Sequence, residues 1–388
     1  MCGPAIIASV DPFLRSARAK QKDLIACIQA LVECESPSGY APGIEQFLNV
    51  FLKMVQDIAR VRVYPGGHLR CEFTLPGSRK QGQILALGHS DTVWPLGTLK
   101  TMPFRQARGR LWGPGVLDMK AGLVFFAFAM RILMEHDVPV RRKVILQVNS
   151  DEEVGSPSSR VLTEEVARPS LAVLVLEPGT GLEGKLKTAR KGVGDYRIKV
   201  RGRAAHAGLD FEKGANAVVE MARQVERIAG FTRITQGNDR GITVSPGVIQ
   251  GGTRSNVVPA ECSVEIDVRA PSASAQRYLE RQFASLKPFD KRCAIEVSGG
   301  LNRPPMERSA GVRHLFQTAC ELGKDLGVAL EESSSGGGSD GNFTAALGIP
   351  TLDGLGAGGE GAHAPNESIL TNRIADRTAL LAKLVAAL

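Results

Sequence analysis

The sequence contains no long apolar run. None of its 388 residues lies in a stretch that approaches the ~18 consecutive apolar residues of a membrane span, so we expect no membrane contact. The N-terminus also lacks the basic segment and the long apolar segment of a secretory signal. These absences predict a cytoplasmic protein, or a periplasmic one if a leader has been removed.

Cysteine is sparse, and no two cysteines have the CxxC spacing. The chain has seven cysteines, an odd number, and they are scattered along the sequence. Disulfides form in oxidising compartments and come in pairs. We therefore expect reduced thiols, which agrees with a cytoplasmic location.

The chain has no concentrated charge of one sign. Its formal net charge is +8, which by itself allows nucleic-acid or anionic-substrate binding, but the basic residues are spread along the sequence. Aromatic residues make up only 5%, and no helix-turn-helix, zinc-finger or aromatic stacking module accompanies the basic residues. We interpret the excess charge as solvated surface and expect no nucleic-acid partner.

One apolar run of strand length leads directly to a histidine and an aspartate. Residues 83–88 are typical of a central strand that is buried on both faces, and His89 and Asp91 follow it. Alternate side chains of an extended segment point the same way, toward the edge where open α/β sheets bind ligands. An imidazole beside a carboxylate suits a metal ligand and its orienting partner. The alternative for this stretch alone is a core histidine beside a turn-forming aspartate.

Two further apolar runs repeat this design. Strands predicted at 144–148 and 171–176 lead to Glu152, Glu153 and Glu177. Helical spacing of apolar residues is found before and between the strands, over 11–34, 42–58 and 123–134. The alternation predicts an α/β fold, and a chain of this length favours two domains.

The segment 192–302 has a different pattern. Its predicted elements follow the order β-α-β-β-α-β, which is that of a small ferredoxin-like α+β sandwich. A buried strand signal of the first kind resumes near 349–352. We therefore predict an inserted domain at 192–302 within a catalytic domain formed by 1–191 and 303–388.

Two loops add further metal-ligand side chains to the three strand ends. Asp118 lies in a glycine-containing loop, and His363 lies near the C-terminus. Two histidines and several carboxylates suit Zn²⁺ or a similar ion with open coordination positions. A carboxylate shared by two ions would hold them roughly 3.5–4 Å apart, as in two-metal hydrolases. Consecutive Glu152 and Glu153 on an extended segment would point opposite ways, one to metal and one to water or substrate.

Five stretches in this order resemble the M20 family of metallopeptidases and amidohydrolases. The resemblance covers nearly the whole chain and is carried by Gly88-His89-Ser90-Asp91-Thr92-Val93, Gly115 to Gly122, Asp151-Glu152-Glu153-Val154-Gly155, Glu177-Pro178 and His363-Ala364-Pro365-Asn366-Glu367. It implies an α/β, mixed-sheet, dizinc exopeptidase-like catalytic domain with an inserted ferredoxin-like lid. It also implies two divalent metal ions, zinc above all, with cobalt or manganese as alternatives.

The resemblance assigns a role to each residue of the expected centre. It implies Glu152 as the general base, Asp91 as the residue that orients the first histidine, and a cis peptide bond between Asp118 and Met119. The implied metal ligands, with Asp118 as the bridging carboxylate, are His89, Asp118, Glu153, Glu177 and His363.

In the inserted segment the resemblance implies substrate contacts and a homodimer interface. His206, in Ala205-His206-Ala207-Gly208, matches a histidine that hydrogen-bonds the developing oxyanion, often across the dimer. Asn256, in a glycine-containing loop, matches a substrate contact. The alternatives are a surface histidine and turn chemistry beside glycine.

Within the family the chain looks most like the glutamate carboxypeptidases. Lys185 and Arg303 match basic residues that hold the carboxylates of the substrate in that branch, although ordinary solvated side chains remain the alternative. Ala121 and Ala364 stand where the family commonly has Gly and Ser, and these departures bear on substrate preference more than on hydrolysis.

The leading hypothesis is a metal-dependent hydrolase that releases a C-terminal amino acid from an N-acyl or peptidyl substrate, and the resemblance implies that this amino acid is glutamate. The alternative within the family is an aminoacylase- or deacetylase-type amidohydrolase with another substrate preference. A non-catalytic binding protein that kept the fold would have lost a ligand or the base, and none is lost in this sequence.

Overall fold

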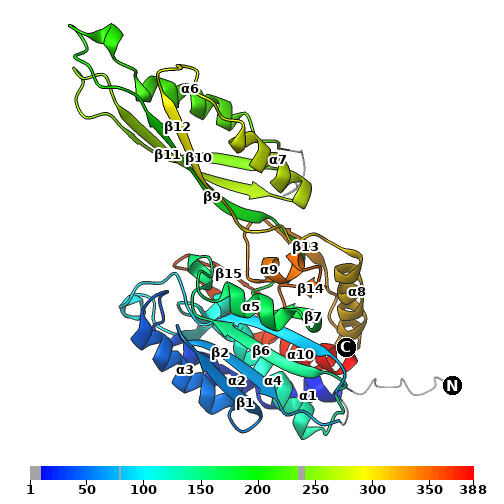
Figure 1. The fold of residues 1–388 in the computed structure, drawn as a ribbon. Helices are drawn as coiled ribbons and strands as arrows, with labels where there is room; N and C mark the ends of the chain where they lie inside the picture. The colour runs from blue at the N-terminus through cyan, green and yellow to red at the C-terminus, as the bar shows by residue number, and fades with distance from the viewer. Residues whose placement is uncertain (1–9, 78–79, 235–240) are drawn as a thin grey trace, which may run out of the picture. The chain divides into compact units, whose positions relative to one another are not determined.

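The computed structural model describes residues 10–77, 80–234 and 241–388. The chain forms two compact units (Figure 1). The first comprises residues 1–188, 308–333 and 339–388, and the second comprises residues 189–307 and 334–338. Within the described residues, no helix is both long enough and apolar enough to cross a membrane.

The first unit is built on a six-stranded mixed sheet. The two strands at one edge pair antiparallel, and the second of them also pairs antiparallel with the third, whereas the remaining four strands are mutually parallel. In sheet order the strands are β1 (Ala59–Tyr64), β2 (His68–Phe73), β6 (Lys143–Asn149), β3 (Gln83–His89), β7 (Ser170–Val175) and β14 (Thr351–Leu352). The predicted α/β fold with buried parallel strands is confirmed.

Helices cover both faces of this sheet, which is why residues Ile84 to Leu87 of its central strand are all apolar. In β3, Ile84 and Ala86 pack into the larger core, whereas Leu85 and Leu87 pack into a smaller core on the opposite face. All seven residues of β3 are buried. The larger core is formed with α1 (Pro12–Ala19), α2 (Gln21–Val32), α3 (Ala41–Val55), α4 (Ala121–Glu135), α8 (Ala310–Asp325) and α10 (Ile374–Ala387), and the smaller with α5 (Arg160–Ala167) and the residues that follow α9 (Gly341–Ala346).

The helical spacing over 11–34 is interrupted in the structure. Lys20 separates α1 from α2, because its φ of −90° and ψ of 8° depart from helical values. The apolar period could not reveal this break, because both helices present an apolar face to the same core.

The chain also forms two smaller sheets, which are separate from the six-stranded sheet and from the main sheet of the second unit. One has the order β15 (Gly359–Glu360), β16 (Ser368–Leu370), β5 (Arg110–Trp112) and β4 (Arg105–Ala107). The other pairs β8 (Leu186–Arg190) with β13 (Glu332–Ser335). These strands are only two to five residues long, which is too short for a period-2 pattern to predict them.

The second unit has a core of its own beneath one antiparallel sheet. Its elements are β9 (Gly192–Arg201), α6 (Ala217–Ala229), β10 (Thr243–Gly251), β11 (Glu261–Ala270), α7 (Ala273–Ala284) and β12 (Ala294–Arg303). The sheet order β10-β11-β9-β12 is that of the ferredoxin-like arrangement. Alternate residues of β9 and β11 face the helices, with Ile198, Val200, Val264 and Ile266 among them.

Candidate metal centre

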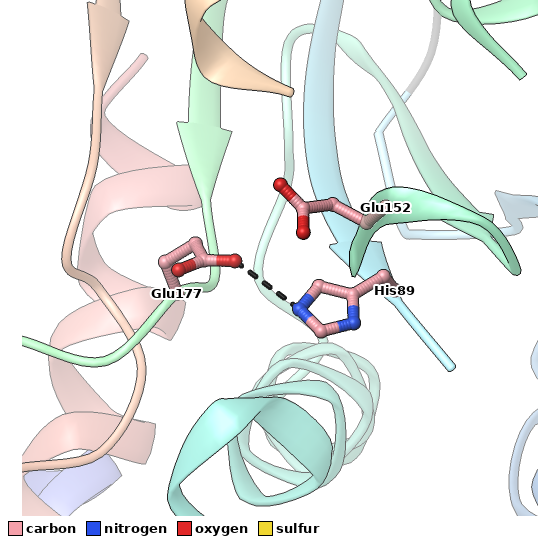
Figure 2. Close-up of side chains that lie close together, drawn as sticks. All are labelled: His89, Glu152 and Glu177. Carbon is pink, nitrogen blue, oxygen red and sulfur yellow. Dashed lines mark ion pairs between the residues drawn. The ribbon is translucent and has the colours of Figure 1, made fainter. Parts of the chain in front are cut away.

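The carboxyl ends of three parallel strands bring the predicted side chains together. His89 is the last residue of β3, and it pairs in register with Asn149, the last residue of β6. Glu152 follows β6 by three residues, and Glu177 follows β7 by two. Because these strands run parallel, their carboxyl ends meet at one edge of the sheet. Figure 2 shows the carboxylates of Glu152 and Glu177 directed toward the ring of His89.

The ring of His89 is held from one side and faces carboxylates on the other. Its Nδ1 lies 3.0 Å from the backbone carbonyl of Asp91 and 3.5 Å from the Asp91 carboxylate. Its Nε2 lies 3.2 Å from Asp118 Oδ1 and 3.2 Å from Glu177 Oε1. The main-chain carbonyl of Asp91 is therefore the nearer group that orients the ring.

Asp118 lies between the two histidines. While Oδ1 faces His89, Oδ2 lies 3.3 Å from Nε2 of His363. The same nitrogen of His363 is 3.4 Å from Glu153 Oε2. His363 reaches this position from a tight turn in which its φ is +61°. The cis peptide bond predicted between Asp118 and Met119 is present.

The segment that carries Glu152 and Glu153 is not extended, so that expectation was wrong. Residues Glu152–Val154 form a 3-10 turn that ends at Gly155, where φ is +90°. The carboxylate of Asp91 accepts hydrogen bonds from the N–H groups of Glu152 and Glu153, both at 3.2 Å. A 3-10 turn leaves its first N–H groups without partners inside the turn, and Asp91 supplies the acceptor.

The turn nevertheless separates the two glutamates into different groups of ligand atoms. One ligand atom from each of His89, Glu152 and Glu177 lies within 4.8 Å of the others. A second group with the same spacing comprises His89, Asp118 and Glu153.

The close carboxylates raise the pKa of both histidines. Burial opposes a charge on the ring of His89, but Asp118 and its neighbouring carboxylates raise its pKa well above the usual value. Asp118 and Glu153 raise the pKa of His363 to about 10. Burial raises the pKa of Glu153, whereas at Asp118 the two histidines outweigh burial and lower the pKa.

The donor set fits divalent cations. When Nδ1 of His89 donates to the Asp91 carbonyl, the Nε2 lone pair faces two carboxylate oxygens, and only a proton or a cation makes that contact favourable. Glu153 Oε1 is buried and has no hydrogen-bond partner among the described residues. An orphaned carboxylate oxygen in this position is a further sign that a cation belongs here.

The structure brings together two of the predicted substrate residues in the second unit. The N–H of Ala207, next to His206, donates to the carbonyl of Asn256 at 3.0 Å. The Nδ1 of His206 accepts from the N–H groups of Gly208 and Leu209, both at 3.1 Å. A neutral ring then carries its proton on Nε2, which makes the exposed edge of His206 a hydrogen-bond donor.

Lys185 and Arg303 lie in different units. The Nζ of Lys185 is 2.6 Å from a carboxylate oxygen of Glu331, and both residues belong to the first unit. Arg303 is buried at the end of β12 in the second unit, where its side chain packs against Gly338.

Two polar residues near the centre had no role in the sequence prediction. The hydroxyl of Ser38 donates to the Asp91 carboxylate at 2.6 Å. Glu367 is fully buried and accepts a hydrogen bond from the backbone of Asp118. The only signal for Glu367 was its place in the motif that begins at His363, and no local pattern indicated Ser38.

We predict that Asp91→Ala lowers metal affinity about 10–100-fold, the usual cost of losing a group that supports metal ligands. The substitution removes the acceptor of the Glu152 and Glu153 N–H groups and leaves the backbone carbonyl that holds His89. Ser38→Ala is the matched control, because it removes one donor and keeps the carboxylate. Zinc titration against a competing chelator measures both variants. Wild-type affinity in Asp91→Ala would contradict the supporting role.

Comparison with known proteins agrees with this geometry. The model of "Peptidase family M20/M25/M40" matches residues 85–387. Carboxypeptidase G2 from Pseudomonas sp. (strain RS-16) is 28% identical over 397 residues, which cover 99% of this chain and 94% of that protein.

Solved structures share the fold. The aminopeptidase PepT from Bacillus cereus superposes with a TM-score of 0.77 at 22% identity, covering 94% of this chain and 98% of that one. A protein from Bacillus subtilis described as a dinuclear metal binding peptidase superposes with a TM-score of 0.68 at 15% identity, covering 95% and 98%. Identities this low show likeness of fold alone.

Proposed function

The chain belongs to peptidase family M20/M25/M40, and from this premise we propose that it releases a C-terminal amino acid, glutamate by preference, from an N-acyl or peptidyl substrate. The observation that carries the proposal is the position of Asp118, whose two oxygens face His89 and His363. A carboxylate with a histidine on each side is the arrangement expected of a ligand shared by two metal ions.

Five side chains would hold the two ions. His89 and Glu177 would bind one ion, His363 and Glu153 would bind the other, and Asp118 would bridge them. Nitrogen and carboxylate donors favour zinc, and cobalt or manganese could replace it. Bound ions of this kind supply a nucleophilic water at neutral pH and polarise the carbonyl of the substrate.

We assign Glu152 as the general base. Its carboxylate belongs to the ligand group of His89 and Glu177, whereas Glu153 belongs to the group of His89 and Asp118. It takes a proton from the attacking water, the carbon–nitrogen bond breaks, and the same carboxyl group returns the proton to the leaving nitrogen. His206 donates from Nε2 to the oxyanion, and Asn256 contacts the substrate.

The preference for glutamate rests on two cations and one relative. Arg303 and Lys185 would bind the carboxylates of the released amino acid, Arg in a bidentate manner and Lys as a point charge. The likeness to carboxypeptidase G2 extends over 99% of this chain. One observation favours the alternative, an aminoacylase- or deacetylase-type amidohydrolase: Lys185 already has an anionic partner in Glu331.

We also propose that the second unit forms a homodimer interface. Among the described residues, β10 lies at the edge of its sheet with β11 as its one neighbour. This edge exposes Val248 and Ile249, and an exposed apolar edge strand pairs readily with another chain.

The six described cysteines are free thiols, which supports the proposed cytoplasmic location.

The role of Glu152 is tested by Glu152→Gln. The amide keeps the shape of the side chain but cannot accept a proton at neutral pH. Turnover should fall at least 100-fold, within the contribution of about 10²–10⁴-fold that general bases make. Elemental analysis should still give two metal ions per chain. Near-normal turnover in a metal-loaded Glu152→Gln enzyme would show that another group takes the proton.

Substrate preference is tested with N-acyl amino acids that differ only in the amino acid. Lys185→Ala and Arg303→Ala should each lower kcat/KM for the glutamate conjugate about tenfold or more relative to the alanine conjugate, since hydrogen bonds to charged groups contribute ~1.5–3 kcal/mol. Lys20→Ala is the control, because Lys20 is also paired with a glutamate, Glu135, at 2.8 Å. No preference for acidic amino acids in the wild type would favour the alternative.

The dimer is tested by sedimentation of the wild type and of Val248→Lys. Lysine on an edge strand opposes strand pairing, so the variant should sediment as a monomer and the wild type as a dimer. A monomeric wild type at all concentrations would refute the proposed interface.

A further inference from the structure

Glu367 is a fully buried carboxylate for which the proposed mechanism has no use. Its two oxygens accept four hydrogen bonds. Oε1 accepts from the N–H groups of Leu117 at 2.9 Å and Asp118 at 3.1 Å. Oε2 accepts from the N–H of Gly115 at 2.9 Å and from the indole Nε1 of Trp94 at 2.7 Å.

These bonds join three segments that each carry a residue of the metal centre. Trp94 lies in the loop that follows His89 at the end of β3. The backbone donors span the loop that ends in Asp118, and one of them is the N–H of Asp118 itself. Glu367 lies four residues after His363, and its own N–H closes the turn by donating to the carbonyl of Ala364 at 2.9 Å.

The type of side chain matters because all four partners are donors. An ionised carboxylate accepts through two oxygens and can satisfy four donors, whereas glutamine accepts through one oxygen and presents an NH₂ group to the others. The N–H groups of Gly115 and Leu117 are buried where they bond to Glu367, so water cannot readily replace the carboxylate as their acceptor. Removing the acceptor would leave buried donors without partners, which forces the loop to move.

We propose that Glu367 is the positioning residue that sets the spacing between the bridging Asp118 carboxylate and the His363 ring. Glu367 acts through the backbone of the Asp118 loop and touches neither metal nor substrate. The proposal rests on the proposed function, since it concerns the same centre. Because Asp118 faces both histidines, the loss of Glu367 weakens the binding of both ions, not of one alone.

The contrasting interpretation is that Glu367 stabilises the fold and has no specific effect on the centre. The two interpretations differ in where the effect of a substitution is found. A general stabilising role changes hydrogen exchange over the whole unit. A positioning role changes exchange at the amides of Gly115, Leu117 and Asp118 and changes metal affinity in a chain that remains folded.

The experiment compares Glu367→Gln with Glu360→Gln in the full chain. Glu360 is a matched control because it lies on β15 in the same C-terminal region but is exposed and paired with Arg110 at 2.6 Å. We expect Glu367→Gln to lower zinc affinity about 10–100-fold for both equivalents, as the loss of supporting groups does. In the metal-free chain, exchange over residues 113–120 should accelerate. Glu360→Gln should match the wild type in both measurements.

Two further variants keep the test decisive. Trp94→Phe removes one donor but leaves the three backbone donors in place, so its zinc affinity should stay within about threefold of the wild type. If Glu367→Gln does not fold, Glu367→Asp keeps the charge while withdrawing it by one methylene. The Asp variant should then show the same two changes at smaller size.

Three outcomes would overturn the proposal. Folded Glu367→Gln that binds two zinc ions with wild-type affinity would remove the positioning role while leaving the proposed function intact. Faster exchange spread evenly over the unit, with unchanged affinity, would establish a general stabilising role instead. A wild-type chain that binds no zinc would contradict the proposed function itself and this proposal with it.

Discussion

The concentration of negative charge at one edge of the main sheet is the constraint on which the rest of the site depends. Asp118, Glu153 and Glu177 approach His89 and His363 within 3.2–3.4 Å, and all three carboxylates are largely removed from water. Buried carboxylates repel one another and lose hydration, so the arrangement is favourable only with cations among them. The chain must therefore hold these groups in place before a cation arrives.

Backbone hydrogen bonds to two other carboxylates provide that support. Asp91 accepts the N–H groups of the turn that carries Glu152 and Glu153. Glu367 accepts the N–H groups of the loop that carries Asp118. In both cases a buried acidic side chain fixes the main chain of a segment whose own side chain faces the centre. Hydrogen bonds at two or three amides restrict the backbone of such a segment, and this restriction keeps its metal-binding side chain in a defined position.

Much of the fold and several residues of the candidate site followed from local patterns. The apolar run before His89 predicted a strand buried on both faces, and the structure places cores on both sides of it. Strand ends predicted at 144–148 and 171–176 lead to Glu152 and Glu177, as observed. The short strands β4, β5, β15 and β16 escaped prediction, because two or three residues carry no period. The break at Lys20 escaped because an apolar stripe continues across it.

The sequence by itself determined which residues could do chemistry and the order in which parallel strands deliver them to one edge. It could do so because apolar period and the chemistry of histidine and carboxylates are local properties. Only the tertiary structure decided the partners: the backbone carbonyl of Asp91 for His89, Glu331 for Lys185, and four donors for Glu367. These pairs join segments far apart in the chain or depend on the direction in which a turn points its N–H groups. Such contacts are fixed by packing, which no short stretch of sequence specifies.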